Sequence, residues 1–160
     1  MINILFVCTG NISRSFLAER LLKNEMSING VKNVAVTSVG VAAYPDTPGD
    51  PEMVVFLKKM GIHADGHRAR IITKKDVDWA DIVLVMEKGH KETIEKKWPE
   101  EKEKIHLLGR YISSGQIVDD ILDPFGKSLY HYRAAQSQIT LAVRSLLKQI
   151  ISDRIGQADA

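Results

Sequence analysis

The chain has a single cysteine, Cys8, among its 160 residues, and this scarcity excludes an internal disulfide. No cluster of cysteine and histidine has the spacing of a zinc site. Basic tracts are also missing, because 22 lysine and arginine residues are scattered among 20 acidic ones and the net charge is only +2. We therefore expect no nucleic-acid partner, no metal and no other cofactor.

Long apolar runs are absent as well. No stretch approaches the roughly 20 apolar residues of a membrane span, and residues 1–4 lack the charged flank of a signal peptide. We therefore expect a cytoplasmic protein with no membrane partner. A composition of 44% hydrophobic and 26% charged residues is typical of one globular domain. We predict a single domain over residues 1–160, frayed at residues 156–160.

Short apolar runs alternate with amphipathic stretches along the chain, which is the pattern of strands alternating with helices. Strands are predicted over residues 2–7, 34–39, 82–85 and 105–108. Helices are predicted over residues 16–25, from Pro51 to just before Gly61, over residues 88–97, and after a polar loop that ends at Ser128. Asp50 suits the cap of the second helix, with Pro51 in its first turn.

This order of elements predicts an α/β fold. The expected architecture is a three-layer sandwich, in which a four-stranded parallel sheet carries helices on both faces. The run at residues 82–85 is apolar throughout, as expected for a strand that is covered on both sides. Ligands of such sheets bind beyond the carboxyl ends of the strands, and Cys8 lies at that edge.

The segment VCTGNISRS, residues 7–15, follows the first predicted strand. Backbone N–H groups between a strand and a helix converge on one point and favour an anion such as phosphate. Gly10 and Asn11 tolerate the left-handed backbone conformation that lets such a loop curl. The guanidinium of Arg14 can donate two hydrogen bonds to two phosphate oxygens. The positive charge of Arg14 and the backbone N–H groups also stabilise a thiolate at Cys8. The segment therefore predicts a phosphate-binding loop with a nucleophilic thiol.

The same segment resembles the signature of the low-molecular-weight protein tyrosine phosphatases, where a cysteine, five loop residues, arginine and serine follow the first strand. The likeness is to the bacterial type and extends from residue 2 to about residue 150, in the order of the family. It continues in four later segments: Ser38-Val39-Gly40, Gly61-Ile62, His67-Arg68-Ala69-Arg70 and Asp123-Pro124-Phe125-Gly126.

The resemblance implies a role for each matching residue. Cys8 would attack phosphorus, Arg14 would hold the phosphoryl oxygens, and Asp123 would be the general acid. Asp119 and Asp120 are rival acids nearby. The other residues of the phosphate-binding loop are Thr9, Gly10, Asn11, Ile12, Ser13 and Ser15. The supporting residues behind that loop are Ser38 and His67, and the expected walls of the substrate slot are Ile12, Tyr44 and Phe125, although Tyr44 suits plain surface packing equally well.

The function implied by the resemblance is hydrolysis of phosphotyrosine through a phosphocysteine intermediate. Its partner would be a phosphorylated protein, with a tyrosine kinase or its targets as candidates. The protein arginine phosphatase branch is the alternative, because it shares the Asp-Pro-Phe-Gly motif. That branch carries threonine where this chain has Ile12, and an apolar side chain favours a phenyl ring over a guanidinium.

Two further points bear on the function. A catalytically silent module that only binds phosphotyrosine is an alternative of another class, and the presence of Cys8, Arg14 and Asp123 together argues against it. Ser13 stands where many family members carry a second cysteine, which can trap an oxidised nucleophile as a disulfide. This chain lacks that protection of the catalytic thiol.

Overall fold

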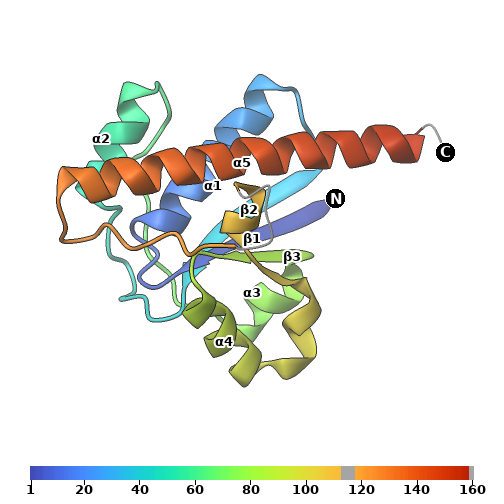
Figure 1. The fold of residues 1–160 in the computed structure, drawn as a ribbon, viewed down its shortest axis with the longest axis horizontal. Coiled ribbons are helices and arrows are strands. Elements are labelled where there is room, and N and C mark those ends of the chain that lie inside the picture. Colours follow the sequence, from blue (N-terminus) through green and yellow to red (C-terminus); the bar gives the residue numbers. More distant parts are fainter. Residues whose placement is uncertain (113–117, 159–160) are drawn as a thin grey trace.

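The computed structural model of the protein describes residues 1–112 and 118–158 (Figure 1). Its single sheet consists of β1 (Ile2–Cys8), β2 (Val34–Gly40), β3 (Ile82–Val85) and β4 (Ile105–Leu107), in the order β2-β1-β3-β4. Neighbouring strands are parallel throughout. The predicted four-stranded parallel sheet is therefore confirmed.

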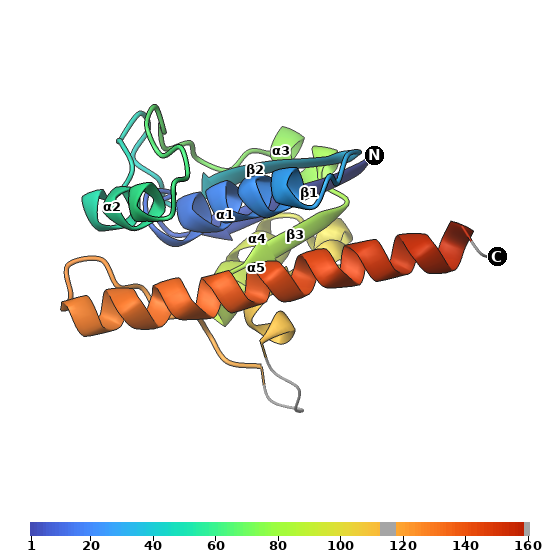
Figure 2. The same cartoon turned by 90° about the horizontal axis from the view of Figure 1, so that it is seen from above.

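Helices cover both faces of this sheet. The core on one face joins the sheet to α1 (Arg14–Ile28), α2 (Pro51–Lys59) and α5 (Leu129–Ala158). The core on the other face joins it to α3 (Lys74–Trp79) and α4 (Lys88–Lys97). Figure 2 shows the 30-residue α5 running past α1 and extending beyond the sheet at its C-terminal end. This arrangement is the three-layer α/β sandwich that the sequence predicts.

The pleat of β1 distributes its side chains between the two cores. Ile4 and Phe6 belong to the core beneath α1 and α5, whereas Leu5 and Val7 belong to the opposite core. Successive side chains of a strand point to opposite faces, and all four are fully buried. Cys8 continues the alternation, so it is buried on the α1 side at the carboxyl end of β1.

Several elements differ from the sequence prediction. The first helix begins at Arg14, two residues before the predicted start. Helix α3 was not predicted, because its six residues make fewer than two turns and carry no apolar period. It is stabilised by a capping box between Thr73 and Asp76. Two 3₁₀ helices, η1 (Pro99–Lys104) and η2 (Leu108–Tyr111), flank β4 and were also missed.

The loop before α5 and the C-terminus are described in part. Residues 113–117 of the predicted polar loop and residues 159–160 of the predicted frayed end lie outside the described residues. Residues 156–158, which were also expected to fray, are the last turn of α5. Within the described ranges, no helix has the length and apolar character needed to cross a membrane. The single-domain organisation of residues 1–160 stays a prediction, and we note that both cores share one sheet.

The strand order determines where a ligand can bind. The chain leaves β1 towards β2 on one side, and it leaves β3 towards β4 on the other side. A crevice opens where the connections diverge in this way, at the carboxyl ends of the two central strands. The loops that follow β1 and β3 therefore meet at one place, with Gly40 at the end of β2 paired to Cys8 beside them.

Gly40 is packed against the loop that follows β1. A Cβ atom at this position would lie 2.5 Å from the carbonyl oxygen of Thr9 and 2.9 Å from the backbone nitrogen of Asn11. Real Cβ atoms do not approach backbone atoms so closely, so a larger residue would push the loop away from β2. Only glycine allows β2 to support the loop at this distance.

We expect Gly40→Ala to lower the free energy of unfolding by about 1–3 kcal/mol, because the added methyl group overpacks a contact with backbone atoms. Gly89→Ala is the matched control, since a Cβ atom there meets nothing within 4 Å and alanine favours a helix. Urea denaturation of both variants and the unaltered protein measures the difference. Equal stability of the two variants would contradict the close contact.

Candidate active site

A cavity of about 210 Å³ opens at the carboxyl end of β1. The loop between β1 and α1 forms most of its wall, and the segment before α5 closes it from the other side. The three residues predicted to be catalytic come together here, although Asp123 is far from the other two in sequence. The residues that line the cavity are Cys8, Thr9, Gly10, Ile12, Ser13, Arg14, Asp123 and Phe125.

The loop curls through one left-handed residue. Asn11 has φ of 56°, in the conformation that its short polar side chain tolerates. Gly10 does not have a positive φ, so the left-handed conformation that glycine tolerates is not used at this position. A Cβ atom at Gly10 would meet only the side chain of Ile12, at 3.8 Å. The turn of the loop therefore depends on Asn11.

A directed chain of hydrogen bonds leads to the sulfur of Cys8. The backbone N–H of Arg70 donates to Asn11 Oδ1 at 3.0 Å, which fixes the orientation of the amide. Asn11 Nδ2 therefore donates to Ser15 Oγ and Ser38 Oγ, both at 2.9 Å. With its oxygen already accepting, Ser15 has one hydrogen to donate, and its two acceptors are Cys8 Sγ at 3.0 Å and, at the longer distance of 3.4 Å, the carbonyl oxygen of Val39. A hydroxyl that donates to the sulfur stabilises the thiolate.

The far end of this chain is a buried carboxylate. Ser38 donates to Glu19 Oε2 at 2.5 Å, and Glu19 Oε1 also accepts from Lys23 at 2.7 Å. Glu19 and Ser38 are 9% and 3% exposed. A carboxylate only accepts hydrogen bonds, so it forces the Ser38 hydroxyl to donate away from Asn11. Ser38 thus supports the loop, as expected, and Glu19 is a partner that the sequence analysis missed.

His67 supports the same loop residue from the other side. Its Nε2 lies 2.5 Å from the carbonyl oxygen of Asn11, and a carbonyl only accepts, so this nitrogen carries the hydrogen. The ring stacks on Phe16 with the centroids 4.4 Å apart. Burial lowers the pKa of His67 below the ordinary value of 6.5. The expected supporting position of His67 agrees with this geometry.

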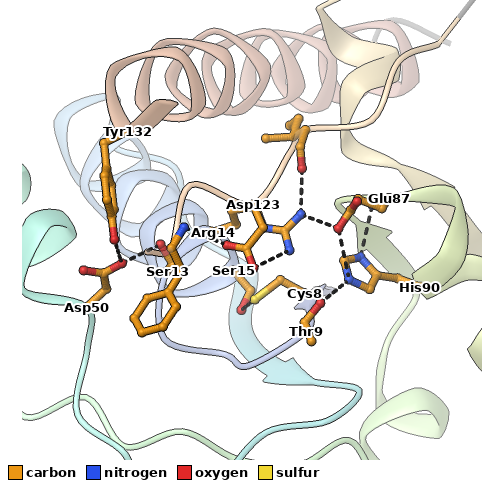
Figure 3. Close-up of polar contacts among 12 residues, drawn as sticks. Cys8, Thr9, Ser13, Arg14, Ser15, Asp50, Glu87, His90, Asp123 and Tyr132 are labelled. Carbon is orange, nitrogen blue, oxygen red and sulfur yellow. Dashed lines mark hydrogen bonds and ion pairs between the residues drawn. The ribbon is translucent and has the colours of Figure 1, made fainter. Parts of the chain in front are cut away.

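Arg14 is almost completely buried, with 1% of its surface exposed. Its NH1 nitrogen donates to Glu87 Oε2 and to the carbonyl oxygen of Ile121, both at 2.7 Å (Figure 3). Its Nε is the one buried side-chain nitrogen or oxygen that has no hydrogen-bond partner in the described part of the chain. A buried donor without a partner costs about 1–3 kcal/mol, and a bound phosphoryl oxygen would supply the missing acceptor.

Asp123 faces Arg14 across the cavity. Asp123 Oδ2 lies 3.7 Å from Arg14 NH2, and Oδ1 accepts from the backbone N–H of Phe125 at 3.1 Å. The side chain of Asp123 is 44% exposed, so it can reach both solvent and a bound molecule. Of the rival acids, Asp119 does not line the cavity, and Asp120 accepts from the backbone N–H of Lys88. The geometry therefore favours Asp123 among the three.

Ser13 connects the loop to two other elements. Its hydroxyl donates to Asp50 Oδ2 at 3.0 Å, and the Tyr132 hydroxyl from α5 donates to the same oxygen at 2.7 Å. Asp50 also caps α2 by accepting from the backbone N–H of Glu52. Burial and the Asp50 carboxylate raise the pKa of Tyr132 above its usual value. The sequence indicated the cap at Asp50 but not its contact with the loop.

The start of α4 supplies two more residues that the sequence analysis missed. His90 Nε2 lies 2.9 Å from the Thr9 hydroxyl, and Glu87 binds Arg14 (Figure 3). His90 is 5% exposed. Burial, followed by the charge of Arg14, lowers the pKa of His90 below 6.5. No motif in the sequence marks either residue, and only the position of β3 beside β1 brings them to the loop.

Of the three residues expected to form the walls of the substrate slot, two line the cavity and one does not. Ile12 is half-buried and Phe125 is 56% exposed, and both line the cavity. Tyr44 is 83% exposed and is absent from the lining, so the structure does not place it in the slot. Within the described ranges, no three histidine, cysteine or acidic side chains gather in a group that could hold a metal ion.

Comparison with known proteins gives a match over nearly the whole chain. Residues 3–155 match the family model described as low molecular weight phosphotyrosine protein phosphatase. Among curated proteins, the probable low molecular weight protein-tyrosine-phosphatase EpsP of Ralstonia nicotianae is 33% identical over 147 residues, which cover 92% of this chain and 94% of EpsP.

Two solved structures are also similar. The YwlE arginine phosphatase from Geobacillus stearothermophilus is 35% identical with a TM-score of 0.87, and the match covers 98% of this chain and 97% of YwlE. Wzb from Vibrio vulnificus, solved in complex with benzylphosphonate, is 31% identical with a TM-score of 0.82 over 92% of this chain and 98% of Wzb. Both likenesses agree with the α/β fold described above.

Proposed function

The chain belongs to the low-molecular-weight phosphotyrosine protein phosphatase family, and from this membership we propose that it hydrolyses phosphotyrosine in proteins through a phosphocysteine on Cys8. It is a cysteine-dependent phosphatase whose substrates are phosphorylated proteins. The observation that carries the proposed chemistry is the cavity itself. Cys8, Arg14 and Asp123 line this one small space, and the buried Nε of Arg14 has no hydrogen-bond partner among the described residues.

In the first step, the Cys8 thiolate attacks phosphorus in line with the bond to the leaving group. The S–P bond forms while the P–O bond to tyrosine breaks, and the electron pair of that bond passes to the phenolic oxygen. The carboxyl group of Asp123 donates a proton to this oxygen, so that tyrosine leaves as a neutral phenol. Ser15 supports the step by stabilising the thiolate before attack.

In the second step, water attacks the phosphocysteine. The Asp123 carboxylate now accepts a proton from the water, the S–P bond breaks, and inorganic phosphate and the Cys8 thiolate are released. Throughout both steps, the Nε and NH2 groups of Arg14 and the backbone N–H groups of the loop hold the phosphoryl oxygens. These donors are already in place in the folded protein, so their alignment costs little during the reaction.

The cavity walls favour phosphotyrosine over phosphoarginine. Ile12 and Phe125 both line the cavity, but only Ile12 discriminates, because Phe125 belongs to the motif shared with the arginine phosphatases and an aromatic ring stacks on either group. A phenyl ring fits against the apolar Ile12 side chain, whereas a guanidinium there would lose hydrogen bonds to water without replacing them. The benzylphosphonate bound by the Vibrio vulnificus relative also carries a phenyl ring.

Protein arginine phosphatase remains the second candidate, and the similarity to the arginine phosphatase of Geobacillus stearothermophilus favours it. The catalytically silent module is less well supported, because a binding module has no need of a general acid beside the thiol. For the partner, we propose a tyrosine kinase or one of its targets. A catalytic thiol needs a reducing compartment, so we also propose a cytoplasmic location.

The proposed acid role of Asp123 predicts a dependence on the leaving group. We expect Asp123→Asn to lower kcat/KM for phosphotyrosine peptides by about 100-fold or more, because kcat/KM reports the step in which tyrosine leaves and phenolate is a poor leaving group without a proton. For p-nitrophenyl phosphate, whose leaving group is stable as an anion, the loss should be much smaller. Asp119→Asn is the control and should leave both rates unchanged. Equal losses on both substrates would remove Asp123 from this role.

The proposed substrate depends on Ile12. We expect Ile12→Thr to raise the ratio of kcat/KM for phosphoarginine peptides to kcat/KM for phosphotyrosine peptides by about 10- to 100-fold, since one polar mismatch is worth about 1–3 kcal/mol. Ile12→Val is the matched control, because valine has the shape of threonine without the hydroxyl group. A preference of the unaltered enzyme for phosphoarginine would overturn the substrate assignment. An unchanged ratio in Ile12→Thr would place specificity in other residues.

A further inference from the structure

The start of α4 lies against both ends of the phosphate-binding loop. Strand β3 is paired directly with β1, and the backbone N–H of Met86 donates to the carbonyl oxygen of Val7 at 3.2 Å. Glu87 and His90 therefore emerge beside the loop that begins after Cys8 (Figure 3). Neither residue lines the cavity. Their contacts are with residues that do.

Glu87 determines which part of the Arg14 guanidinium is free. The NH1 nitrogen has two hydrogens, and Glu87 Oε2 and the carbonyl oxygen of Ile121 accept one each at 2.7 Å. The Nε–NH2 edge is then the only side with two parallel N–H groups left for an anion. This edge is the fork that binds two phosphoryl oxygens at once. A guanidinium that rotated away from Glu87 would present another edge or none.

His90 determines how the Thr9 hydroxyl is oriented. The backbone N–H of Glu87 donates to His90 Nδ1 at 3.1 Å, so this nitrogen carries no hydrogen. In the neutral ring the hydrogen is therefore on Nε2, which donates to Thr9 Oγ1 at 2.9 Å. The Thr9 hydroxyl accepts this bond and keeps its own hydrogen free. Thr9 lines the cavity, so the free hydrogen is available to a phosphoryl oxygen.

We propose that Glu87 and His90 are positioning residues of this phosphatase. Glu87 holds Arg14 so that its Nε–NH2 edge faces the phosphoryl group. His90 holds the Thr9 hydroxyl so that it donates to the same group. The inference rests on the proposed function, because it requires a phosphoryl group to bind in this cavity.

The first test separates the position of the Glu87 side chain from its charge. Glu87→Gln removes the charge but keeps an oxygen that can accept from Arg14. Glu87→Asp keeps the charge but withdraws the carboxylate by one methylene group. We expect Glu87→Gln to stay within about threefold of the unaltered enzyme in kcat/KM and Glu87→Asp to lose about 10- to 100-fold, because small displacements of an oriented group are costly.

Affinity for inorganic phosphate, measured by calorimetry, gives a readout that does not depend on turnover. It should weaken about tenfold in Glu87→Asp and should not weaken in Glu87→Gln, where a negative charge beside Arg14 has been removed. Glu95→Ala, elsewhere on α4, is the control and should change neither quantity. Equal behaviour of the two Glu87 variants, or a larger loss in Glu87→Gln, would overturn the role of Glu87.

The second test is a double-mutant cycle. If His90 acts through Thr9, His90→Leu and Thr9→Val should each lower kcat/KM by about tenfold, and the double variant should be no slower than either. His90→Gln should restore most of the rate, because the glutamine amide can place an N–H group near the position of Nε2. Additive losses, or a His90→Gln variant as slow as His90→Leu, would overturn the role of His90.

The two proposals fail in different ways. If the unaltered protein did not hydrolyse phosphotyrosine, the proposed function would be wrong, and the phosphate affinities of the Glu87 variants would still test the positioning. If the unaltered protein turned over normally and the variants did not separate as described, the positioning would be wrong and the function would stand.

Discussion

The structure depends on the orientation of one side-chain amide, that of Asn11. The backbone N–H of Arg70 occupies its oxygen, so its nitrogen must donate to Ser15 and Ser38. The hydrogen of the Ser15 hydroxyl then has two acceptors, Cys8 Sγ at 3.0 Å and the carbonyl oxygen of Val39 at 3.4 Å, while Ser38 donates away towards Glu19. The left-handed backbone at Asn11 places the amide at this junction. The shape of the loop and the hydrogen-bond network that reaches the sulfur therefore meet at this one residue.

Three elements, β2, α2 and α4, hold the phosphate-binding loop in place around Asn11. The end of β2 supports it through the close contact at Gly40, and the start of α2 holds Ser13 through Asp50. The start of α4 contacts its two ends through Glu87 and His90. The donors are thus aligned before a phosphoryl group arrives, which is the condition under which hydrogen bonds stabilise a transition state most effectively.

The sequence predicted what depends on local pattern. The short apolar runs predicted the four strands. The segment of residues 7–15 and the Asp-Pro-Phe-Gly motif contain the residues that line the cavity. The sequence failed where the answer depends on tertiary arrangement. Glu87 and His90 reach the loop only because β3 lies beside β1, an order that the pattern of runs does not specify. Tyr44 has no motif around it, and the structure leaves it exposed.

The most direct test of this account is to trap the covalent intermediate. Unaltered enzyme mixed with a phosphotyrosine peptide is denatured rapidly, digested and examined by mass spectrometry. Because Cys8 is the only cysteine, a phosphoryl group on the peptide that contains it can be assigned to the sulfur by fragmentation. The account predicts one phosphoryl group on Cys8. A phosphoryl group on another residue, or none in an enzyme that is turning over substrate, would contradict it.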